Sequence, residues 1–271
     1  MPAASPFGPG PFLIAGPCVV EDDRLNVAVG EALAALAARL RIPVIYKASY
    51  DKANRSRLGA ARGPGAAAGL AALARVRAAT GLPILTDVHE VAQVEAAAAV
   101  ADVLQVPAFL CRQTDLLVAV GRAGKPVNLK KGQWMSPEGM AGAVEKVRSG
   151  GGGAVAVTER GTFFGYGDLV VDMRAFTRLK AACGTPVIYD GTHSVQQPGR
   201  GADGASGGLR EFIPPLLMAA AAAGADGFFL ETHPDPAHAP SDGPNMLPLA
   251  ALPDVVARAL DVWRSARVPH D

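Results

Sequence analysis

Short apolar runs alternate with alanine-rich segments of helical length along almost the whole chain, and this alternation limits the possible folds most strongly. The runs are continuous rather than polar at every second residue, as expected of parallel strands buried on both faces. Eight strands are predicted, at residues 12–15, 44–46, 84–85, 103–106, 127–129, 154–157, 187–189 and 227–230. The segments between them, such as 26–40 and 66–79, have the length and composition of helices. This repeated alternation predicts a (β/α)8 TIM barrel of the α/β class.

A chain of 271 residues is long enough for one such barrel, which takes about 250 residues. We therefore expect a single domain over residues 1–271, with a short N-terminal extension at 1–11. The alternative fold is a doubly wound open sheet, which would need a glycine-rich phosphate-binding turn after its first strand. The sequence at that point is AGPCVVE, which is not such a turn. The barrel is therefore the preferred fold.

The overall composition excludes several classes of protein. The formal net charge is +1, with 26 basic and 25 acidic residues, so the chain lacks the positive excess of a nucleic-acid-binding domain. No apolar stretch reaches the roughly 18 residues that a membrane span needs, and the N-terminus lacks signal-peptide features. Cys18, Cys111 and Cys183 are too few for a disulfide framework. We expect a cytoplasmic protein with no membrane or nucleic-acid partner.

Positive charge is concentrated in the segment VIYKASYDKANRSR, residues 44–57, where an apolar run opens into a polar loop. Its cations and its neutral hydrogen-bonding residues are Lys47, Lys52, Arg55 and Arg57, and Ser49, Asn54 and Ser56. Such a loop is suited to binding phosphate or carboxylate oxygens. The segment therefore predicts a small anionic substrate, and Ser49 is expected to be among the residues that bind it.

Polar residues follow nearly every predicted strand, where a barrel places the residues of its active site. They include Cys18, Glu21, Lys47, Asp87, Gln105, Lys130, Lys131, Glu159, Arg160, Asp190, His193 and Glu231. Lys47 and Lys130 each end an apolar run directly, and a buried cation there needs an anionic partner such as a substrate. For Arg57, Arg62 and Lys131, a solvated position or an ion pair is an equal alternative.

A second group of residues has the chemistry of metal ligands. They follow the first, seventh and eighth predicted strands: Cys18, His193, Glu231 and Asp242. A thiolate, an imidazole and carboxylates can hold a divalent cation, and neighbouring strands of a closed barrel would bring them together. The simpler alternative is that Cys18 is a small buried hydrophobic residue. Other possible ligands are His233, His238, and the pair of Asp87 and His89.

Two glycine-rich stretches are predicted to be loops. Residues 196–208, QQPGRGADGASGG, follow the seventh strand, and a loop of this length is typical of a lid over an active site. Simple surface disorder is the alternative. Residues 149–153 precede the sixth strand, and we expect them to form a turn at the opposite end of the barrel.

A series of motifs occurs in a fixed order along the chain: IAGPCVVE, YKASYDKANRSR, LTDVHE, LQVPAFLCRQTDLL, VNLKKGQW, TERGTFFGYGDLVVDMR, YDGTHSVQQPG and LETHPDPAHAPSDGPNML. In this order they resemble the 3-deoxy-D-manno-octulosonate-8-phosphate synthase family, from about residue 12 to residue 247. The KANRS sequence at 52–56 is the most specific part. The related 3-deoxy-D-arabino-heptulosonate-7-phosphate synthases carry a Lys-Pro-Arg-Thr type of sequence at that strand.

The resemblance implies condensation of phosphoenolpyruvate with D-arabinose 5-phosphate, a step toward lipopolysaccharide that releases phosphate. The residues that match the family's phosphoenolpyruvate contacts are Lys47, Lys52, Gln105, Lys130 and Arg160, and those that match its arabinose 5-phosphate site are Asn54, Arg55 and Ser56. We expect the catalytic residues to be Lys47, Lys52, Lys130, Arg160, His193 and Asp242. Arg112 matches an arginine that reaches the substrate of a neighbouring subunit, which implies a homo-oligomer, expected to be a tetramer.

The family has a metal-dependent branch with cysteine in the AGPC position and a metal-independent branch with asparagine there. The resemblance therefore implies a complete ligand set in this chain: Cys18, His193, Glu231 and Asp242. KKGQ at 130–133 also resembles the metal-dependent members. We expect one divalent metal ion per subunit, with zinc, iron(II), manganese and cobalt as alternatives. The ion would either polarise the sugar aldehyde or orient the attacking water.

Three other functions are alternatives on the same fold. A heptulosonate synthase would use erythrose 4-phosphate, and KANRS argues against it. A non-catalytic sugar-phosphate sensor would be expected to lack at least one active-site residue, and none is missing from the sequence. A class II metal aldolase would use a histidine-rich ligand set and would consume no phosphoenolpyruvate.

Overall fold

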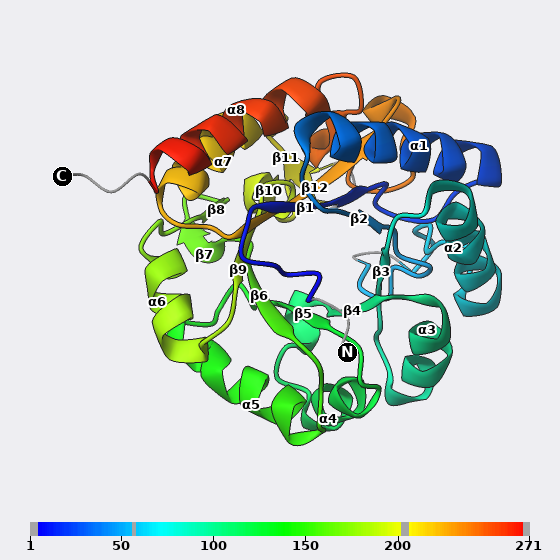
Figure 1. Cartoon of the computed structure of the whole chain (residues 1–271), viewed down its shortest axis with the longest axis horizontal. Coiled ribbons are helices and arrows are strands. Elements are labelled where there is room, and N and C mark those ends of the chain that lie inside the picture. The colour runs from blue at the N-terminus through cyan, green and yellow to red at the C-terminus, as the bar shows by residue number, and fades with distance from the viewer. Residues whose placement is uncertain (1–4, 56–57, 202–205, 268–271) are drawn as a thin grey trace.

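The computed structural model describes residues 5–55, 58–201 and 206–267. Within these residues, eight parallel strands close into a barrel in the order β1-β2-β3-β4-β5-β6-β9-β12, and β12 pairs back with β1 (Figure 1). The strands are β1 Phe12–Gly16, β2 Val44–Lys47, β3 Ile84–Asp87, β4 Val103–Val106, β5 Val127–Lys130, β6 Val155–Glu159, β9 Val187–Asp190 and β12 Gly227–His233. The predicted TIM barrel is confirmed. Most strands extend further at their carboxyl ends than predicted, because the backbone hydrogen bonds continue through the first polar residue.

Helices surround the barrel and cover the outer faces of its strands (Figure 1). They are α1 Asp23–Leu40, α2 Ala66–Thr80, α3 Val94–Val100, α4 Thr114–Arg122, α5 Ala141–Ser149, α6 Ala175–Cys183, α7 Ile213–Ala222 and α8 Leu252–Ser265. Short 3₁₀ turns lie at Val91–Gln93, Ala108–Leu110, Glu138–Met140, His193–Val195, Arg210–Phe212, Pro236–His238 and Gly243–Asn245. Asp22 caps α1 by accepting a 2.9 Å hydrogen bond from the backbone N–H of Leu25. None of the described helices is long and apolar enough to cross a membrane.

Side chains on each strand alternate between the helices and the barrel interior. The outward set, such as Val44 and Tyr46 of β2, packs against the helices. The inward set and Phe7 from the N-terminal segment form a separate apolar cluster, the lower interior, which consists of Phe7, Phe12, Ile14, Ile45, Leu85, Val103, Ala156, Ile188 and Phe229. Two residues further along several of these strands, the next inward side chain is polar. Because of this change, the lower interior supports the fold and the carboxyl ends are free to form a polar site.

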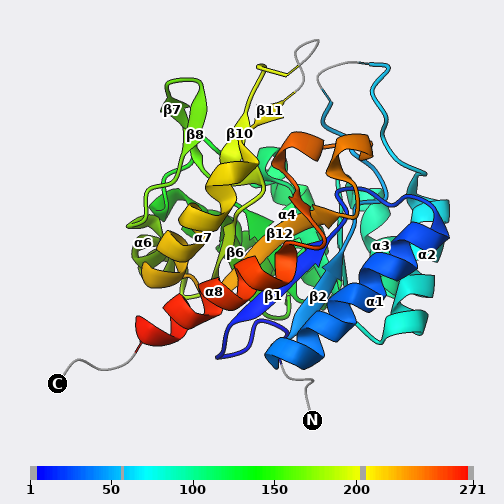
Figure 2. The ribbon, with the colours of Figure 1, turned by 90° about the horizontal axis from the view of Figure 1, so that it is seen from above.

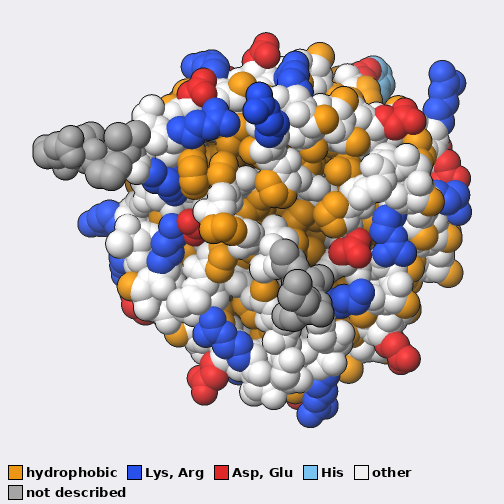
Figure 3. Space-filling model, in the orientation of Figure 1, with side chains coloured by type: hydrophobic (Ala, Val, Ile, Leu, Met, Phe, Trp, Pro, Cys, Tyr) orange, Lys and Arg blue, Asp and Glu red, His pale blue; other side chains and the backbone are white. Residues whose placement is uncertain are grey.

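Residues 5–11, the described part of the predicted N-terminal extension, cover the bottom of the barrel, where Phe7 joins the lower interior. Phe7 is buried, and its ring lies 5.7 Å from that of Phe12 at the start of β1. The described chain begins and ends at this end, opposite the long loops (Figure 2). On the face viewed in Figure 3, side chains of both charges are interspersed around the edge, and apolar side chains gather toward the centre. Residues 1–4 lie outside the described part of the chain.

Small strands that the sequence pattern missed occur in the loops of the upper face. β7 Thr162–Gly165 and β8 Asp168–Val170 form an antiparallel hairpin, and β13 Leu247–Pro248 pairs with β12. The loop predicted at 196–208 contains a second antiparallel pair, β10 Gln196–Gln197 with β11 Gly207–Gly208; residues 202–205 are outside the described chain. These strands are too short to leave a hydropathy signal. The turn predicted at 149–153 begins at Ser149, the last residue of α5, and leads to β6 as expected.

Candidate active site at the carboxyl ends of the barrel strands

A cavity of about 1150 Å³ opens at the carboxyl ends of the strands, where the sequence predicted the active site. The predicted site residues that line it are Lys47, Lys52, Asn54, Arg55, Gln105, Lys130, Arg160, His193 and Asp242. Cys18 and Glu231 are buried next to this cavity. Cys18 contacts Asp242 of its wall, and Glu231 contacts Lys47. The fold therefore brings together residues that are more than 200 positions apart in sequence, such as the pair of Cys18 and Asp242.

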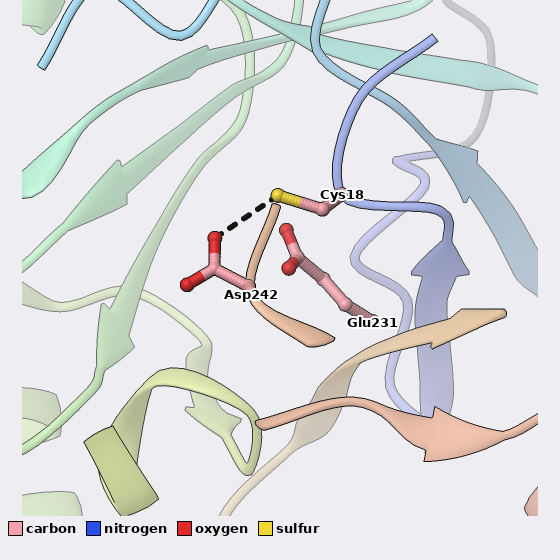
Figure 4. A group of neighbouring side chains, drawn as sticks. All are labelled: Cys18, Glu231 and Asp242. Carbon is pink, nitrogen blue, oxygen red and sulfur yellow. Dashed lines mark hydrogen bonds between the residues drawn. The ribbon is translucent and has the colours of Figure 1, made fainter. Parts of the chain in front are cut away.

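Three of the four predicted metal ligands converge at one point (Figure 4). One ligand atom from each of Cys18, Glu231 and Asp242 lies within 4.8 Å of the others, and the Cys18 thiol donates a 3.0 Å hydrogen bond to Asp242 Oδ2. His193 is outside this tight group, but its Nε2 lies 3.8 Å from Glu231 Oε1. The arrangement results from barrel closure, because Cys18 follows β1, Glu231 belongs to the adjacent β12, and Asp242 lies in the loop after β12.

Local backbone geometry explains two features of this cluster. A side chain at Gly16 would place its Cβ 2.1 Å from the carbonyl oxygen of Lys47, so glycine is required where β1 passes β2 just before Cys18. Asp242 has a left-handed backbone, with φ 55°, which aspartate tolerates better than most residues. Unusual backbone conformations of this kind concentrate at functional sites, and this one accompanies the contact of the Asp242 carboxylate with Cys18.

The chemistry of the cluster fits a divalent metal ion. Glu231 Oε2 is buried and has no hydrogen-bond partner among the described residues, so one carboxylate oxygen is available as a ligand. Burial, together with the charges of Glu231 and Asp242, holds the pKa of the Cys18 thiol well above its usual range. A cation would compensate these negative charges and favour the thiolate. Sulfur, nitrogen and carboxylate oxygen are the ligand types of zinc and related transition metals.

The other histidines considered as ligands have different partners. His233 Nε2 lies 3.2 Å from Glu21 Oε1, and its Nδ1 accepts a hydrogen bond from the backbone of Asp235. His238 is exposed and contacts the side chain of Asp235. Neither belongs to the cluster of ligand atoms found among the described residues.

Two lysines meet the buried carboxylate of Glu231. Lys47 Nζ lies 2.5 Å from Glu231 Oε1 and 3.0 Å from the carbonyl oxygen of Cys18, and Lys52 Nζ lies 3.8 Å from the same Glu231 atom. Burial alone would raise the pKa of Glu231, but the lysines and His193 together lower it, so the group stays ionised. Burial opposes the charge on Lys52 and would lower its pKa. The neighbouring acidic groups raise the pKa by more: Cys18, Glu231, Asp87 and Asp242.

Asp190, which ends β9, links the cationic residues to the predicted metal ligand His193. Its Oδ2 lies 2.5 Å from Lys130 Nζ and 2.8 Å from His193 Nδ1. Burial alone would raise the pKa of Asp190, but nearby cations and the bond to His193 lower it by more, so the carboxylate stays ionised. The ionised carboxylate holds His193 through Nδ1, which leaves Nε2 facing Glu231. The sequence placed Asp190 at a strand end but gave it no role. Burial lowers the pKa of Lys130 to about 8, and its Nζ lies 3.2 Å from the ring centroid of Phe229.

Loop residues tie the upper wall of the cavity together. Arg160 donates a 2.5 Å hydrogen bond to Gln196 Oε1 in β10, and Gln196 Nε2 donates to Asp242 Oδ1 at 2.9 Å. Arg55 donates to Ser241 Oγ at 2.8 Å, which connects the 51–55 loop with the loop after β12. The stretch predicted as a lid therefore begins with a residue bonded to two residues of the site.

Comparisons with known proteins assign the chain to a family. Residues 8–260 match the DAHP synthetase I family. The chain belongs to this family. A 2-dehydro-3-deoxyphosphooctonate aldolase of Koribacter versatilis (strain Ellin345) is 52% identical over 264 residues, covering 97% of this chain and 94% of the relative.

Further relatives carry the same name. The aldolase of Bradyrhizobium diazoefficiens is 53% identical over 258 residues, covering 95% of this chain and 91% of the relative. That of Syntrophotalea carbinolica is 55% identical over 237 residues, covering 88% of this chain and 85% of the relative. This family member is therefore an enzyme of the aldol type, not a non-catalytic barrel.

The remaining predicted residues lie away from the cavity or beyond the described chain. Ser49 is fully buried, and its hydroxyl donates to Asp87. Arg112 is exposed just before α4 and does not line the cavity of its own chain among the described residues. Ser56, like Arg57, falls outside the described residues.

Two of the cations for which an ion pair was the alternative do have carboxylate partners. Lys131 is buried, and its Nζ lies 3.5 Å from Glu159 Oε1. Arg62 is exposed, and its Nη2 lies 2.5 Å from Asp51 Oδ2. Neither residue lines the cavity in the described structure.

Proposed function

We propose that this chain condenses phosphoenolpyruvate with D-arabinose 5-phosphate and water to give 3-deoxy-D-manno-octulosonate 8-phosphate and phosphate. The observation that most directly supports this reaction is the position of KANRS, residues 52–56, which begins at the edge of the cavity. The cavity walls bear several cations: Lys47, Lys52, Arg55, Lys130 and Arg160. Phosphoenolpyruvate and arabinose 5-phosphate are both anionic. The relatives named as 2-dehydro-3-deoxyphosphooctonate aldolases support this reaction.

In the proposed reaction, C3 of the enol attacks the aldehyde carbon of the sugar while water adds at C2. The acyclic bisphosphorylated hemiketal then expels phosphate by cleavage of its C–O bond. Lys47, Lys130 and Arg160 would hold the carboxylate and phosphate of phosphoenolpyruvate, while Asn54 and Arg55 would hold the sugar phosphate. Holding both anions in attack geometry contributes several kcal/mol, on the order of 7–11 in the best intramolecular cases. The same cations stabilise negative charge that develops during the reaction.

We also propose one divalent metal ion per subunit, bound by Cys18, His193, Glu231 and Asp242. The orphaned Glu231 Oε2 supports this assignment. Such an ion supplies Lewis-acid polarisation or water activation when bound. The chain's own contribution is to orient the ligands: Asp190 holds the His193 ring, and Lys47 holds one oxygen of Glu231.

The first test is phosphate release from phosphoenolpyruvate with arabinose 5-phosphate, before and after treatment with a chelator and with metal added back. Activity that disappears and is then restored by a divalent ion supports both the reaction and its metal dependence. Activity that survives complete chelation, verified by elemental analysis, contradicts the metal proposal and leaves the condensation standing. Absence of phosphate release under all these conditions contradicts the condensation itself.

The second candidate function is the same condensation with erythrose 4-phosphate, since the matched family is named for DAHP synthetase. The same assay with erythrose 4-phosphate in place of arabinose 5-phosphate decides between them. We expect a kcat/KM at least about 100-fold higher for arabinose 5-phosphate, because the site would lose contacts to the extra hydroxyl-bearing carbon. A preference for erythrose 4-phosphate would overturn the assignment.

We further propose that the working enzyme is a homo-oligomer, expected to be a tetramer, in which Arg112 serves the site of a neighbouring subunit. Its exposed position away from its own cavity supports this role. Light scattering after size-exclusion chromatography measures the assembly. Mixing inactive Arg112→Ala protein with inactive Lys52→Ala protein should restore part of the activity if subunits exchange, because some mixed pairs contain one intact site. Full activity of Arg112→Ala by itself would contradict the proposal.

A further inference from the structure

A continuous series of hydrogen bonds between buried side chains crosses the barrel beside the cavity, from β6 to the loop after β2. Its members, which we call the amide ladder, are Thr158, Asn128, Gln105, Asp87 and Ser49. Thr158 Oγ1 donates to Asn128 Oδ1 at 2.6 Å, Asn128 Nδ2 to Gln105 Oε1 at 2.8 Å, and Gln105 Nε2 to Asp87 Oδ1 at 2.5 Å. The Ser49 hydroxyl donates to the other oxygen of Asp87.

The direction of every bond in the ladder follows from the carboxylate of Asp87, which accepts from both of its neighbours. Burial raises the pKa of Asp87, but Lys47 and Lys52 lower it more strongly, so the group is ionised and can only accept hydrogen bonds. Gln105 must therefore present its NH₂ group to Asp87 and its oxygen to Asn128. Asn128 must in turn present NH₂ to Gln105 and its oxygen to the Thr158 hydroxyl. One orientation of both amides satisfies all these contacts.

The ladder determines what Gln105 offers to the cavity. Gln105 lines the cavity, whereas the fully buried Asn128 and Thr158 do not, among the described residues. One N–H of its amide is used on Asp87, and the second has no acceptor among the described residues. With the oxygen held by Asn128, the group free to meet a ligand is an N–H donor. That donor suits a carboxylate or phosphate oxygen.

Apolar side chains would fill these buried positions without any polar group to satisfy, as the lower interior does. A fully satisfied buried network instead fixes one geometry. We infer that Asn128 and Thr158 are positioning residues that act through Gln105, holding its amide N–H toward an anionic oxygen of phosphoenolpyruvate. This inference rests on the proposed function.

The test compares two variants at one position. Thr158→Val keeps the shape of the side chain but removes the hydroxyl, and Thr158→Ser keeps the hydroxyl but removes the methyl group. Binding of phosphoenolpyruvate to the metal-replete protein is measured by titration calorimetry without sugar phosphate. We expect the Kd of Thr158→Val to rise about tenfold, equivalent to ~1.4 kcal/mol, and that of Thr158→Ser to stay within about twofold of wild type. KM for phosphoenolpyruvate should follow the same order, with KM for the sugar phosphate unchanged.

A second variant covers the case in which Thr158→Val does not fold. Asn128→Asp keeps the size of the residue and its bond from Thr158, but it turns the donor facing Gln105 Oε1 into an acceptor. We expect a weaker Kd for phosphoenolpyruvate here as well. Wild-type affinity in a folded Thr158→Val or Asn128→Asp protein would overturn the ladder inference while the proposed function stands. A wild-type protein that binds no phosphoenolpyruvate would overturn the proposed function, and this inference with it.

Discussion

The lower interior of the barrel and its mouth, meaning the carboxyl ends of the strands around the cavity, are built from the same strands. Their inward side chains differ: they are apolar in the lower interior and polar or charged at the mouth. Below, inward side chains such as Ile45 and Ile188 are apolar and tightly buried. Two residues further on, Lys47 and Asp190 are also almost fully buried, yet they are charged. The strands continue unchanged through the transition, so the difference lies in the side chains and not in the backbone.

The contrast shows how stability and function are divided along each strand. Burial of apolar surface at about 25 cal/mol per Å² stabilises the lower interior and the helix layer. Buried ion pairs at the mouth, such as that of Lys47 and Glu231, gain little net stability because both groups lose their hydration. Their retention there is explained by the anions and cations that the mouth is proposed to bind. Substitutions in the two regions should therefore change different measured quantities.

The largest effect is expected from removing the thiol at the mouth. Cys18→Ala should lose the bound metal ion and, with it, turnover, because the cation loses its sulfur ligand. Metal content per chain is measured by elemental analysis alongside phosphate release. Cys183→Ala is the matched control, since Cys183 is also buried but lies in α6 of the helix layer and does not line the described cavity. A Cys18→Ala protein with full metal content and full activity would refute the ligand assignment.

Removing a buried cation should have the next largest effect. Lys47→Met leaves the Glu231 carboxylate without its 2.5 Å partner, and we expect a fall of about 10²–10³-fold in kcat/KM. The free energy of unfolding should also fall by about 3–5 kcal/mol in urea denaturation. The control is Lys180→Met, because Lys180 forms a 2.6 Å pair with Asp226 whose side chains are 38% and 26% exposed. Its loss should change the unfolding free energy by at most about 1 kcal/mol. Equal effects from both variants would contradict the special role of the buried pair at the mouth.

The pH dependence of substrate binding gives a smaller, graded test of the mouth. Lys130 has a pKa lowered to about 8, so below this pH it is a cation that attracts anions, and above it the charge is lost. A bound anion favours the protonated form, so binding should take up a proton above pH 8. We expect the Kd for phosphoenolpyruvate to rise up to about tenfold per pH unit there, as measured by calorimetry in buffers of different ionisation enthalpy. In Lys130→Met, affinity should be weaker at pH 7 and flat above pH 8.

The smallest effect on activity is expected in the lower interior. Phe12→Ala removes a fully buried ring that packs against Phe7, and the unfolding free energy should fall by about 3–5 kcal/mol. At 25 °C, kcat calculated per folded molecule should stay within about twofold of wild type, because Phe12 does not line the cavity. Phe212→Ala, at a ring that is 49% exposed, is the control and should cost no more than about 1 kcal/mol. A large loss of kcat at full folding would show that the two regions are coupled.

Much of the fold could be predicted from the sequence because parallel barrel strands carry a strong local signal. Runs such as 44–46 and 187–189 are continuous and apolar, and all the predicted strands are present in the barrel. The β7–β8 hairpin and the β10–β11 pair were missed because their residues are few, polar or glycine-rich. Their positions depend on contacts such as that between Arg200 and the backbone of Tyr166, which no local pattern encodes.

The position of the site could also be predicted, because barrel geometry places polar strand ends at one mouth. The individual contacts could not. Ser49 was expected to bind substrate, and nothing in the sequence indicated that its buried hydroxyl donates to Asp87. Asp190 had no predicted role, although it joins Lys130 to His193. Asn128 lies within a predicted strand and gave no signal by itself.

The sequence by itself determined the alternation of strand and helix, the apolar faces and the residue types at the strand ends, since these depend on the period of hydrophobicity along the chain. Tertiary structure decided which side chains meet. Cys18, Glu231 and Asp242 come together because β1 pairs with β12 when the barrel closes, and Asp242 holds its place through a left-handed backbone. Closure joins residues far apart in the chain, and hydrogen-bond geometry between buried groups is fixed by that closure and not by neighbours in sequence.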